Sequence, residues 1–261
     1  MQISPYRGKK MSWRKRFGQH MLINDKILDY EVAMLRPEGL AVLEIGGGTG
    51  NLTAKLAGKA KKLIVIEKDT DYVNELVEKF GGEKNVEILQ GDFLQMKPEE
   101  IGKIDVVAGN VPYSISSPII FKLLDYDFDR ALLCVQKEFG KRIVAKVGEP
   151  DHSRLSVMTQ YYFDPTYLKS VSKGSFRPIP KVDSAVIMLR KKNVKKNEEL
   201  EKFVEKLFSH KNKTLGAALK SREFEGQGEL LKYVGQEQLE KKRVYELKLS
   251  ELIELSRRFQ A

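Results

Sequence analysis

The sequence has very little cysteine and lacks a long apolar run, and each absence excludes classes of protein. Cys134 is its single cysteine, which excludes a disulfide framework and any cysteine-rich zinc or iron–sulfur site and is typical of a reducing compartment. The longest apolar runs, 63–66 and 131–135, are far shorter than the roughly 18–20 residues of a membrane span. The polar, basic start of the chain does not resemble a secretory signal. We therefore expect a cytoplasmic protein that makes no use of a membrane.

The positive charge is unevenly distributed along the chain. The 46 Lys and Arg residues outnumber the 36 Asp and Glu residues and give a net charge of +10. Residues 1–16 carry a net +6 and residues 190–261 another +6, whereas the 173 residues between them carry −2. Such flanks bind nucleic-acid backbones, because neutralised phosphates release counterions; a solvated tail explains a short basic run equally well. The candidate RNA-binding residues of the first flank are Arg7, Lys9, Lys10, Arg14, Lys15 and Arg16.

From residue 40 onwards, short apolar runs alternate with amphipathic stretches. Two late runs, 163–170 and 184–190, are joined by a proline-bearing turn and predict an antiparallel pair at a sheet edge. Five earlier runs are rich in Val, Ile and Leu, as buried parallel strands require. They lie at 40–45, 62–67, 86–89, 104–108 and 131–135. The pattern predicts an α/β fold with a mostly parallel sheet.

Helical periodicity is clearest in two places. After the second predicted strand, Asp69 or Thr70 is expected to cap a helix. The face expected to pack on the sheet consists of Val73, Leu76, Val77 and Phe80. A charged linker at 191–197 precedes another predicted helix, so the chain is expected to end in a small helical unit. The apolar face of that helix consists of Leu200, Phe203, Val204, Leu207 and Phe208.

A glycine-rich turn, Gly46 to Gly50, directly follows the first predicted strand and precedes a helix. Glycines at the carboxyl edge of an α/β sheet allow a tight turn and close approach of a ligand, which favours a nucleotide-like molecule. The dinucleotide fingerprint would need glycine at the position of Asn51, so NAD is the weaker interpretation. A P-loop is excluded, because no Gly-Lys-Ser or Gly-Lys-Thr closes the turn.

Acidic residues follow the next two predicted strands. Glu67 ends the second strand, and Asp92 follows the third. Because parallel strands end at one edge of the sheet, both carboxylates are expected to face one crevice beside the glycine turn. There one can accept the hydroxyls of a ribose and the other an exocyclic amino group. Either acid alone is better explained as a helix cap or surface residue, but the ordered set is similar to that of S-adenosylmethionine-dependent methyltransferases.

The tetrapeptide Asn110-Val111-Pro112-Tyr113 stands at the end of the fourth predicted strand. An enzyme that methylates the exocyclic amine of adenine must accept its N–H groups and aim its nitrogen at the sulfonium methyl. The Asn110 oxygen and the Val111 carbonyl can each accept one N–H, and Pro112 restricts the preceding residue to extended geometry. Tyr113 offers a ring for base stacking, worth about 1–3 kcal/mol. Without the glycine turn upstream, a strand-ending turn with a packed tyrosine would be the simpler interpretation.

In their order along the chain, these motifs resemble those of the small-subunit ribosomal RNA adenine dimethyltransferases of KsgA type, over essentially the whole length. The matching segments are Phe-Gly-Gln-His-Met-Leu at 17–22, Glu-Ile-Gly-Gly-Gly-Thr-Gly at 44–50, Glu67, Gly-Asp-Phe at 91–93, the tetrapeptide at 110–113, Gln-Lys-Glu at 136–138 and Ser-Phe-Arg-Pro-Ile-Pro-Lys-Val-Asp-Ser at 175–184. Departures from the family pattern are mild. Gly47 replaces a frequent proline, Val111 a frequent leucine, and His20-Met21 a frequent Asn-Phe.

The resemblance implies a Rossmann-like class I methyltransferase fold with a mostly parallel seven-stranded sheet and a small C-terminal all-helical domain. It divides the chain into a basic arm with a cofactor-site segment (1–24), a methyltransferase domain (25–190) and a helical rRNA-binding domain (197–261). It implies transfer of methyl groups from S-adenosylmethionine, with S-adenosylhomocysteine as product, to N6 of two adjacent adenosines in the 3′-terminal hairpin loop of small-subunit rRNA. The expected partner is an immature small subunit during ribosome biogenesis, met by a monomer of this chain.

The resemblance also carries over site residues, position by position. Those that hold the target base are Asn110, Val111, Pro112, Tyr113 and, closing on its other face, Phe176. Those that bind the cofactor are Gln19, His20, Leu22, Glu44, Gly46, Gly48, Gly50, Glu67, Lys68, Asp92, Phe93 and Asn110. Within this set, Gln19 and the glycine turn face the methionine part, Glu67 the ribose, and Asp92 with Phe93 the adenine.

No metal is implied by these motifs. His20, His152 and His210 are far apart in the sequence and not at ligand spacing, so structural or surface roles are the simpler explanation. Cys134 lies in an apolar strand and is explained as a small core residue.

Three rival functions stay open. A large-subunit rRNA adenine methyltransferase of the resistance-methylase type shares the tetrapeptide and the Phe-Pro-Lys segment. A non-catalytic RNA-binding assembly or transcription factor with a vestigial methylase fold is disfavoured by the intact acceptors and glycines. A DNA adenine methylase is weaker still, because no segment resembles a separate base-reading domain.

Overall fold

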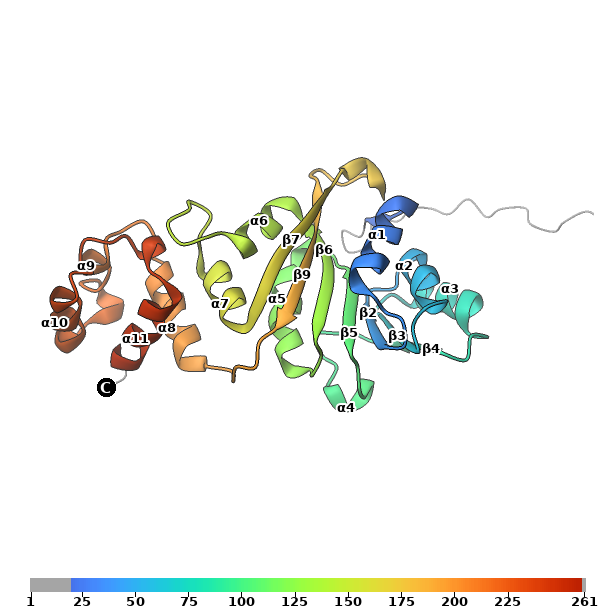
Figure 1. The fold of residues 1–261 in the computed structure, drawn as a ribbon, viewed down its shortest axis with the longest axis horizontal. Coiled ribbons are helices and arrows are strands. Elements are labelled where there is room, and N and C mark those ends of the chain that lie inside the picture. Colours follow the sequence, from blue (N-terminus) through green and yellow to red (C-terminus); the bar gives the residue numbers. More distant parts are fainter. Residues whose placement is uncertain (1–19, 260–261) are drawn as a thin grey trace, which may run out of the picture.

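A computed structural model of the chain describes residues 20–259. Figure 1 shows a central sheet flanked by helices, with a separate group of helices at the C-terminal end of the long axis. No helix in the described range is long and apolar enough to cross a membrane. Seven of the predicted site residues lie outside this range, namely Arg7, Lys9, Lys10, Arg14, Lys15, Arg16 and Gln19.

Within the described range, the main sheet has seven strands in the order β4-β3-β2-β5-β6-β9-β7. The parallel strands are β2 (Ala41–Ile45), β3 (Lys62–Glu67), β4 (Val86–Gln90), β5 (Val106–Asn110) and β6 (Arg130–Gln136). The edge pair β9 (Ser184–Lys191) and β7 (Phe163–Val171) runs antiparallel, with β9 next to β6. The class I methyltransferase fold and its antiparallel edge are thereby confirmed.

Alternate strand residues pack into cores on opposite faces of the sheet, as the period of two requires. One core contains Val42, Leu63 and Val65, and is covered by the helices α1 (Asp25–Leu35), α2 (Asn51–Ala57) and α3 (Thr70–Phe80). The other contains Leu43 and Ile64, and is covered by α5 (Ser116–Lys122), α6 (Lys137–Val144) and α7 (Arg154–Tyr162). Both faces are covered, which is why the strands are apolar on both sides.

Helix α3 begins where it was predicted but buries a narrower face. Asp69 caps it by accepting a hydrogen bond from the amide of Asp71. Leu76 is fully buried, whereas Val77 is 51% exposed, so its predicted place on the packed face is wrong. The reason is position: α3 lies against β4 and β3 at the parallel edge of the sheet, and only a narrow stripe meets the core.

The remaining elements are short or lie in the C-terminal group. The two-residue strands β1 (Met21–Leu22) and β8 (Phe176–Arg177) pair antiparallel, and α4 (Pro98–Ile101) is a single turn after β4. The C-terminal helices are α8 (Glu198–Phe208), α9 (Leu215–Ala218), α10 (Gly228–Gln236) and α11 (Leu249–Phe259). All five residues of the apolar face predicted for α8 are buried.

Tyr162, at the end of α7, joins the sheet to this helical group. Its hydroxyl donates to Glu201 Oε1 at 2.6 Å and accepts from the Asn197 amide at 2.9 Å. Its carbonyl accepts from the Lys192 amide at 2.9 Å. The apolar core also continues from α7 into α8, and the charged linker is bonded to Tyr162 near both of its ends, at Lys192 and Asn197.

Candidate active site

The glycine turn leaves β2 at the carboxyl edge of the sheet and leads into α2 (Figure 1). Gly46, Gly48 and Gly50 have φ of 80°, 51° and 82°, a left-handed backbone that only glycine adopts at little cost. At Gly48 a side chain would in addition come within 2.7 Å of Met21 Sδ. The turn therefore presents bare backbone to the adjoining space.

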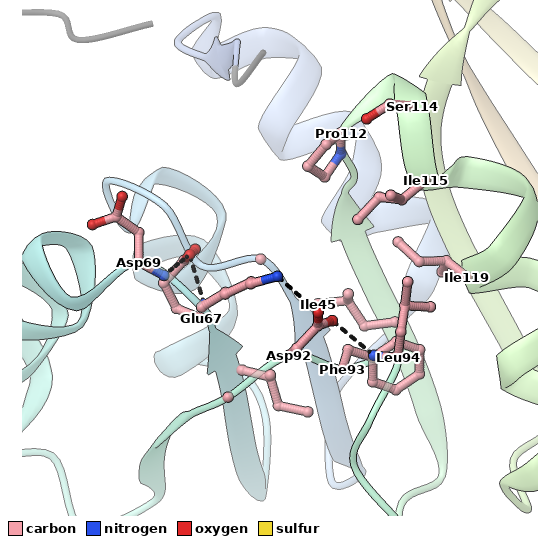
Figure 2. A pocket seen from close by; sticks show the side chains of 14 residues that line it. Ile45, Glu67, Asp69, Asp92, Phe93, Leu94, Pro112, Ser114, Ile115 and Ile119 are labelled. Atoms are coloured by element: carbon pink, nitrogen blue, oxygen red, sulfur yellow. Dashed lines mark hydrogen bonds and ion pairs between the residues drawn. The ribbon is translucent and has the colours of Figure 1, made fainter. Parts of the chain in front are cut away.

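Glu67, the last residue of β3, ties this turn to the start of α3. Its Oε2 accepts from the Gly48 amide at 2.9 Å, and its Oε1 accepts from the amides of Lys68 and Asp69 at 2.8 and 2.9 Å. Figure 2 shows the last two bonds at the wall of the cavity that is described below. A carboxylate has about four acceptor positions. Three are used here, so Glu67 keeps one position for a ligand hydroxyl.

Asp92 and Lys68 form an ion pair across the same cavity (Figure 2). Lys68 Nζ donates to Asp92 Oδ2 at 2.9 Å, and the Leu94 amide donates to Oδ1 at 3.0 Å. The hydrogen bond from Lys68 is the main reason why the pKa of Asp92 lies below its usual value. Asp92 is therefore an ionised acceptor at neutral pH, as recognition of an amino group requires.

The cavity beside these acids has a volume of about 420 Å³. Polar groups line one wall, and aliphatic side chains line the other, as Figure 2 shows for Ile115 and Ile119. Phe93 is buried at its floor and stacks on Tyr126 with ring centroids 5.3 Å apart. A mostly apolar cleft with a few convergent polar groups is typical of small-molecule sites, and this one suits a planar base joined to a ribose.

A second, smaller cavity of about 30 Å³ adjoins the first. Gly46, Glu67 and Pro112 line both cavities, so the glycine turn and the tetrapeptide meet there. The other lining residues of the smaller cavity are His20, Met21, Gly48, Asn110, Val111 and Tyr113. Three segments that are distant in the sequence thus converge on one point between the nucleoside-sized cavity and Tyr113.

Asn110 is the last residue of β5 and presents an acceptor with no partner. Its Nδ2 donates to Glu31 Oε2 at 3.3 Å. Its Oδ1 is buried and makes no hydrogen bond with any group of residues 20–259. An unpaired buried oxygen of this kind costs about 1–3 kcal/mol of stability, and such a cost is usual where a ligand completes the hydrogen bonding.

Tyr113 is held from two sides. Its hydroxyl lies 2.6 Å from that of Ser184, the first residue of β9, and burial raises the pKa of Tyr113. The ring of His20 stacks on the Tyr113 ring at 5.8 Å and 28°. His20 Nδ1 donates to the Pro178 carbonyl at 2.7 Å. The structure places His20, a predicted cofactor contact, beside Tyr113.

Three other predicted site residues are buried and line neither cavity. Phe176 is 2% exposed, is paired with Leu22 across β1 and β8, and lines neither cavity. Leu22 is buried, and its carbonyl accepts from Asn51 Nδ2 at 2.8 Å. Glu44 is buried and accepts from Thr53 Oγ1 at 2.7 Å, and burial raises its pKa to about 8. The contacts of Leu22 and Glu44 thus hold the start of α2, the helix that follows the glycine turn.

Metal ligation finds no support among residues 20–259, where no group of three or more His, Cys, Asp or Glu side chains is arranged to hold an ion. His152 Nδ1 donates to the Tyr245 carbonyl, and His210 Nε2 lies 3.2 Å from Glu223. Cys134 is buried in β6, where desolvation raises the pKa of its thiol. A buried, protonated thiol of this kind is unreactive.

Sequence reasoning missed Glu31 and Ser184 as neighbours of the site. Glu31 lies among the apolar residues Ile27, Leu28 and Val32 on the buried face of α1. A carboxyl on an otherwise apolar helical face is the signal that could have found it, because such groups are almost never buried without a purpose or a partner. Ser184 carries no comparable signal in the sequence.

Comparison with known proteins places the chain among rRNA adenine methylating enzymes. The family model described as Ribosomal RNA adenine dimethylase matches residues 10–257. The chain is 45% identical over 205 residues to the probable ribosomal RNA small subunit methyltransferase A of Thermococcus sibiricus, covering 78% of this chain and 74% of that protein. It is 41% identical over 223 residues to ribosomal RNA small subunit methyltransferase A of Coxiella burnetii, covering 81% and 86%.

Two solved structures resemble the fold over nearly all of the chain. A dimethyladenosine transferase from Plasmodium falciparum has a TM-score of 0.81 at 32% identity, covering 90% of this chain and 96% of the other. The 23S rRNA methyltransferase ErmE has a TM-score of 0.67 at 26% identity, covering 92% and 100%.

Proposed function

Since this chain belongs to the ribosomal RNA adenine dimethylase family, we propose that it methylates N6 of two adjacent adenosines in the 3′-terminal hairpin loop of small-subunit rRNA. The methyl donor is S-adenosylmethionine, and each base receives two methyl groups. The observation that carries the proposal is the buried Asn110 Oδ1, which has no partner among residues 20–259 and belongs to a residue that lines the smaller cavity.

The donor and acceptor groups present fit S-adenosylmethionine. The single free acceptor position of Glu67 suits a ribose hydroxyl, and a second hydroxyl would replace one of the amides that Glu67 now binds. Asp92 suits the adenine amine, and the apolar wall with Phe93 suits the ring. The methionine part is assigned to the glycine turn, where backbone is exposed. When bound, this cofactor supplies an electrophilic methyl group on a sulfonium.

The chain's own residues act on the target base. Asn110 Oδ1 and the Val111 carbonyl accept the two N–H groups of the adenine amine, which orients the nitrogen lone pair and stabilises positive charge that develops on it. Pro112 has φ of −56° and holds this segment extended. The Tyr113 ring offers the stacking face, and its hydroxyl bond to Ser184 limits its rotation. Proximity and orientation supply most of the acceleration.

Phe176 is proposed to close on the opposite face of the base, which requires it to leave the core. At present it is buried beneath β1. Because β1 and β8 are only two residues long and pair only with each other, this ribbon is the weakest sheet element near the site. Opening the ribbon would free Phe176 and move His20 from Tyr113 at the same time.

The proposal is tested by nucleotide-resolution mapping of methyl groups. Purified chain and labelled S-adenosylmethionine are incubated with small subunits that lack these methyl groups and, in a parallel reaction, with large-subunit rRNA. Asn110→Ala is the inactive control. Label on two adjacent adenosines of the 3′-terminal hairpin supports the proposal. Label only on large-subunit rRNA would establish the rival activity that the likeness to ErmE favours. Binding of rRNA without any cofactor binding would leave the assembly-factor function instead.

A further inference from the structure

Glu31 is a buried carboxyl that the proposed chemistry leaves without a role. It lies on α1, is 1% exposed, and is surrounded on its own helix by apolar side chains. Burying an acid in such a place is costly unless the group is protonated, paired or hydrogen-bonded. Among residues 20–259, the one hydrogen bond to its side chain comes from Asn110, the residue assigned to the target amine.

The contact between Glu31 and Asn110 uses one oxygen of the carboxyl group and the nitrogen of the amide. Asn110 Nδ2 donates to Glu31 Oε2 at 3.3 Å. Glu31 Oε1 and Asn110 Oδ1 are both buried, and neither has a hydrogen-bond partner in the described part of the chain. Asn110 lines the smaller cavity and Glu31 does not, so the amide atom that Glu31 leaves unbonded is the one available to that cavity.

The protonation state of Glu31 decides which atom of the Asn110 amide, Oδ1 or Nδ2, is left for the cavity. An ionised carboxylate only accepts hydrogen bonds, so it selects Nδ2 and leaves Oδ1 for the target amine. A protonated carboxyl can donate to Oδ1 instead. The amide would then be turned by half a rotation, with Nδ2 toward the cavity, and packing would not resist because the two amide ends have nearly the same shape. An N–H donor there cannot accept the adenine amine.

We propose that Glu31 is a positioning residue whose ionised form holds the Asn110 amide with its oxygen toward the target base, and whose protonated form removes that preference. This inference rests on the proposed function, because it takes Asn110 Oδ1 as the acceptor of the adenine amine. Helix α1, which carries Glu31, would then contribute to catalysis without contacting the substrate.

The surroundings of Glu31 place both forms within reach near neutral pH. Burial raises its pKa to about 8, and the hydrogen bond from Asn110 opposes that rise. The groups that face it are the Asn110 amide from β5, the buried carboxyl of Glu44 from β2 and the Cys134 thiol from β6. From α2, Lys55 binds Asp25 and Asp29 on the exposed side of α1 instead.

Cofactor charge provides the natural control on this equilibrium. A cation bound near Asn110 favours the ionised form of a neighbouring acid and lowers its pKa. S-adenosylmethionine carries a positive sulfur and S-adenosylhomocysteine does not, while the two are otherwise nearly the same shape. With S-adenosylmethionine bound, Glu31 would therefore be ionised and hold the Asn110 oxygen toward the target base. With S-adenosylhomocysteine bound, that preference would weaken.

The first test observes the carboxyl directly. The full chain is labelled with ¹³C at the glutamate carboxyl carbons, and the Glu31 resonance is identified by its absence in Glu31→Gln. The signal is titrated between about pH 6 and pH 9, alone and with each cofactor. We expect a midpoint above that of ordinary glutamates, lower with S-adenosylmethionine than with S-adenosylhomocysteine. A Glu31 signal that stays in one form throughout, or moves equally with both cofactors, would overturn the inference.

The second test compares turnover with pH at saturating cofactor and RNA. For the wild type, kcat should rise with pH along the same midpoint as the NMR signal. Glu31→Gln should lower kcat by about tenfold or more, remove that pH limb and change KM for cofactor much less. Glu87→Gln, which changes an exposed carboxyl paired with Lys62, is the control and should keep the wild-type profile. A Glu31→Gln enzyme that keeps the limb refutes the inference.

Two further outcomes keep the inference separate from the proposed function. If Glu31→Gln does not fold, Asn110→Ala serves instead, and its Glu31 midpoint should rise because the lowering hydrogen bond is gone; an unchanged midpoint counts against the pairing. If the wild type binds no S-adenosylmethionine or labels no rRNA, the proposed function fails. If it does both and Glu31→Gln behaves like the wild type, only the role of Glu31 fails.

Discussion

The hydroxyl groups of Tyr113 and Ser184 lie 2.6 Å apart and connect the tetrapeptide after β5 to the antiparallel strand β9. Ser184 is fully buried and pairs with Gln136 of β6 and Val171 of β7. The Tyr113 ring is therefore held in part by a strand that carries none of the predicted cofactor-binding residues. The effect of the ring's orientation on activity can therefore be tested separately from the effect of removing the ring.

Tyr113→Phe should keep base stacking and lose this orienting bond. We expect kcat to fall by roughly threefold to tenfold, since a single neutral hydrogen bond is worth about 0.5–1.5 kcal/mol. Tyr113→Ala should also raise KM for RNA, because stacking is worth about 1–3 kcal/mol per base. Steady-state kinetics on unmethylated small subunits measures both values. Equal effects of the two substitutions would show that the ring itself contributes nothing.

Asn110→Ala should abolish turnover and largely spare cofactor binding. The lost atom is the acceptor for the target amine, and removal of such a group costs about 10²–10³ in kcat. Calorimetric titration with S-adenosylhomocysteine and a single-turnover methylation assay separate the two properties. Loss of both to the same degree would contradict the assigned role and make Asn110 part of the cofactor site alone.

Glu67→Gln should weaken both the cofactor site and the fold. A carboxamide can accept at one end only, so its NH₂ would face at least one of the amides of Gly48, Lys68 and Asp69. We expect the free energy of unfolding to fall by about 1–3 kcal/mol and cofactor affinity by at least about tenfold. Urea unfolding and calorimetry check these values. The control is Glu87→Gln, which alters an exposed ion pair with Lys62 and should change neither.

The free energy of unfolding should decrease as pH rises from about 5.5 to about 7.5. The pKa values of Glu31 and Glu44 are raised from 4.5 to about 8. In this window the folded chain keeps protons that the unfolded chain has lost, so each group lowers stability by up to about 1.4 kcal/mol per pH unit.

Glu31→Gln removes one of these two groups, so its unfolding free energy should depend less on pH than that of the wild type. Urea denaturation without cofactor at both pH values measures the difference. The comparison between variants cancels the opposite contribution of His152, whose pKa is lowered by burial. Parallel pH dependence of the two proteins would mean that Glu31 is not protonated in the folded state.

Neutralising Arg14, Lys15 and Arg16 together should reduce rRNA affinity and its salt dependence. Each lost phosphate contact reduces the slope of log K against log salt by about 0.7–0.9. Filter binding over a salt series gives the slope. The control is the triple change of Lys59, Lys61 and Lys84, which are exposed near the amino ends of β3 and β4, away from the site. A slope equal to that of the wild type would make the arm a solvated tail.

The parts of the site that follow from parallel strand order were predictable. The ends of β2, β3 and β5 carry the glycine turn, Glu67 and Asn110 to one edge, because strand direction is readable from short apolar runs and their connections. The antiparallel edge pair was readable for the same reason. These features depend on the backbone pattern and on few particular contacts.

The contacts that were not predicted join residues far apart in the chain. His20 meets Tyr113, and Glu31 meets Asn110, through packing that hydrophobic periodicity does not encode. Phe176 lies in a two-residue strand, too short to give any alternation of apolar and polar residues. Val77 shows the opposite failure: its spacing is helical, but the width of the buried face depends on where α3 meets the sheet.

The hydrogen bonds of Tyr162 set the separation between the sheet and the C-terminal helices. One side chain anchors the amide of Asn197 and the carboxylate of Glu201, and its own carbonyl holds Lys192, so the helical group is clamped to the end of α7. We therefore propose that an RNA that contacts both the crevice and the C-terminal helices meets two surfaces held at one separation. The distance between a hairpin loop and a second contact on the RNA would then contribute to substrate choice.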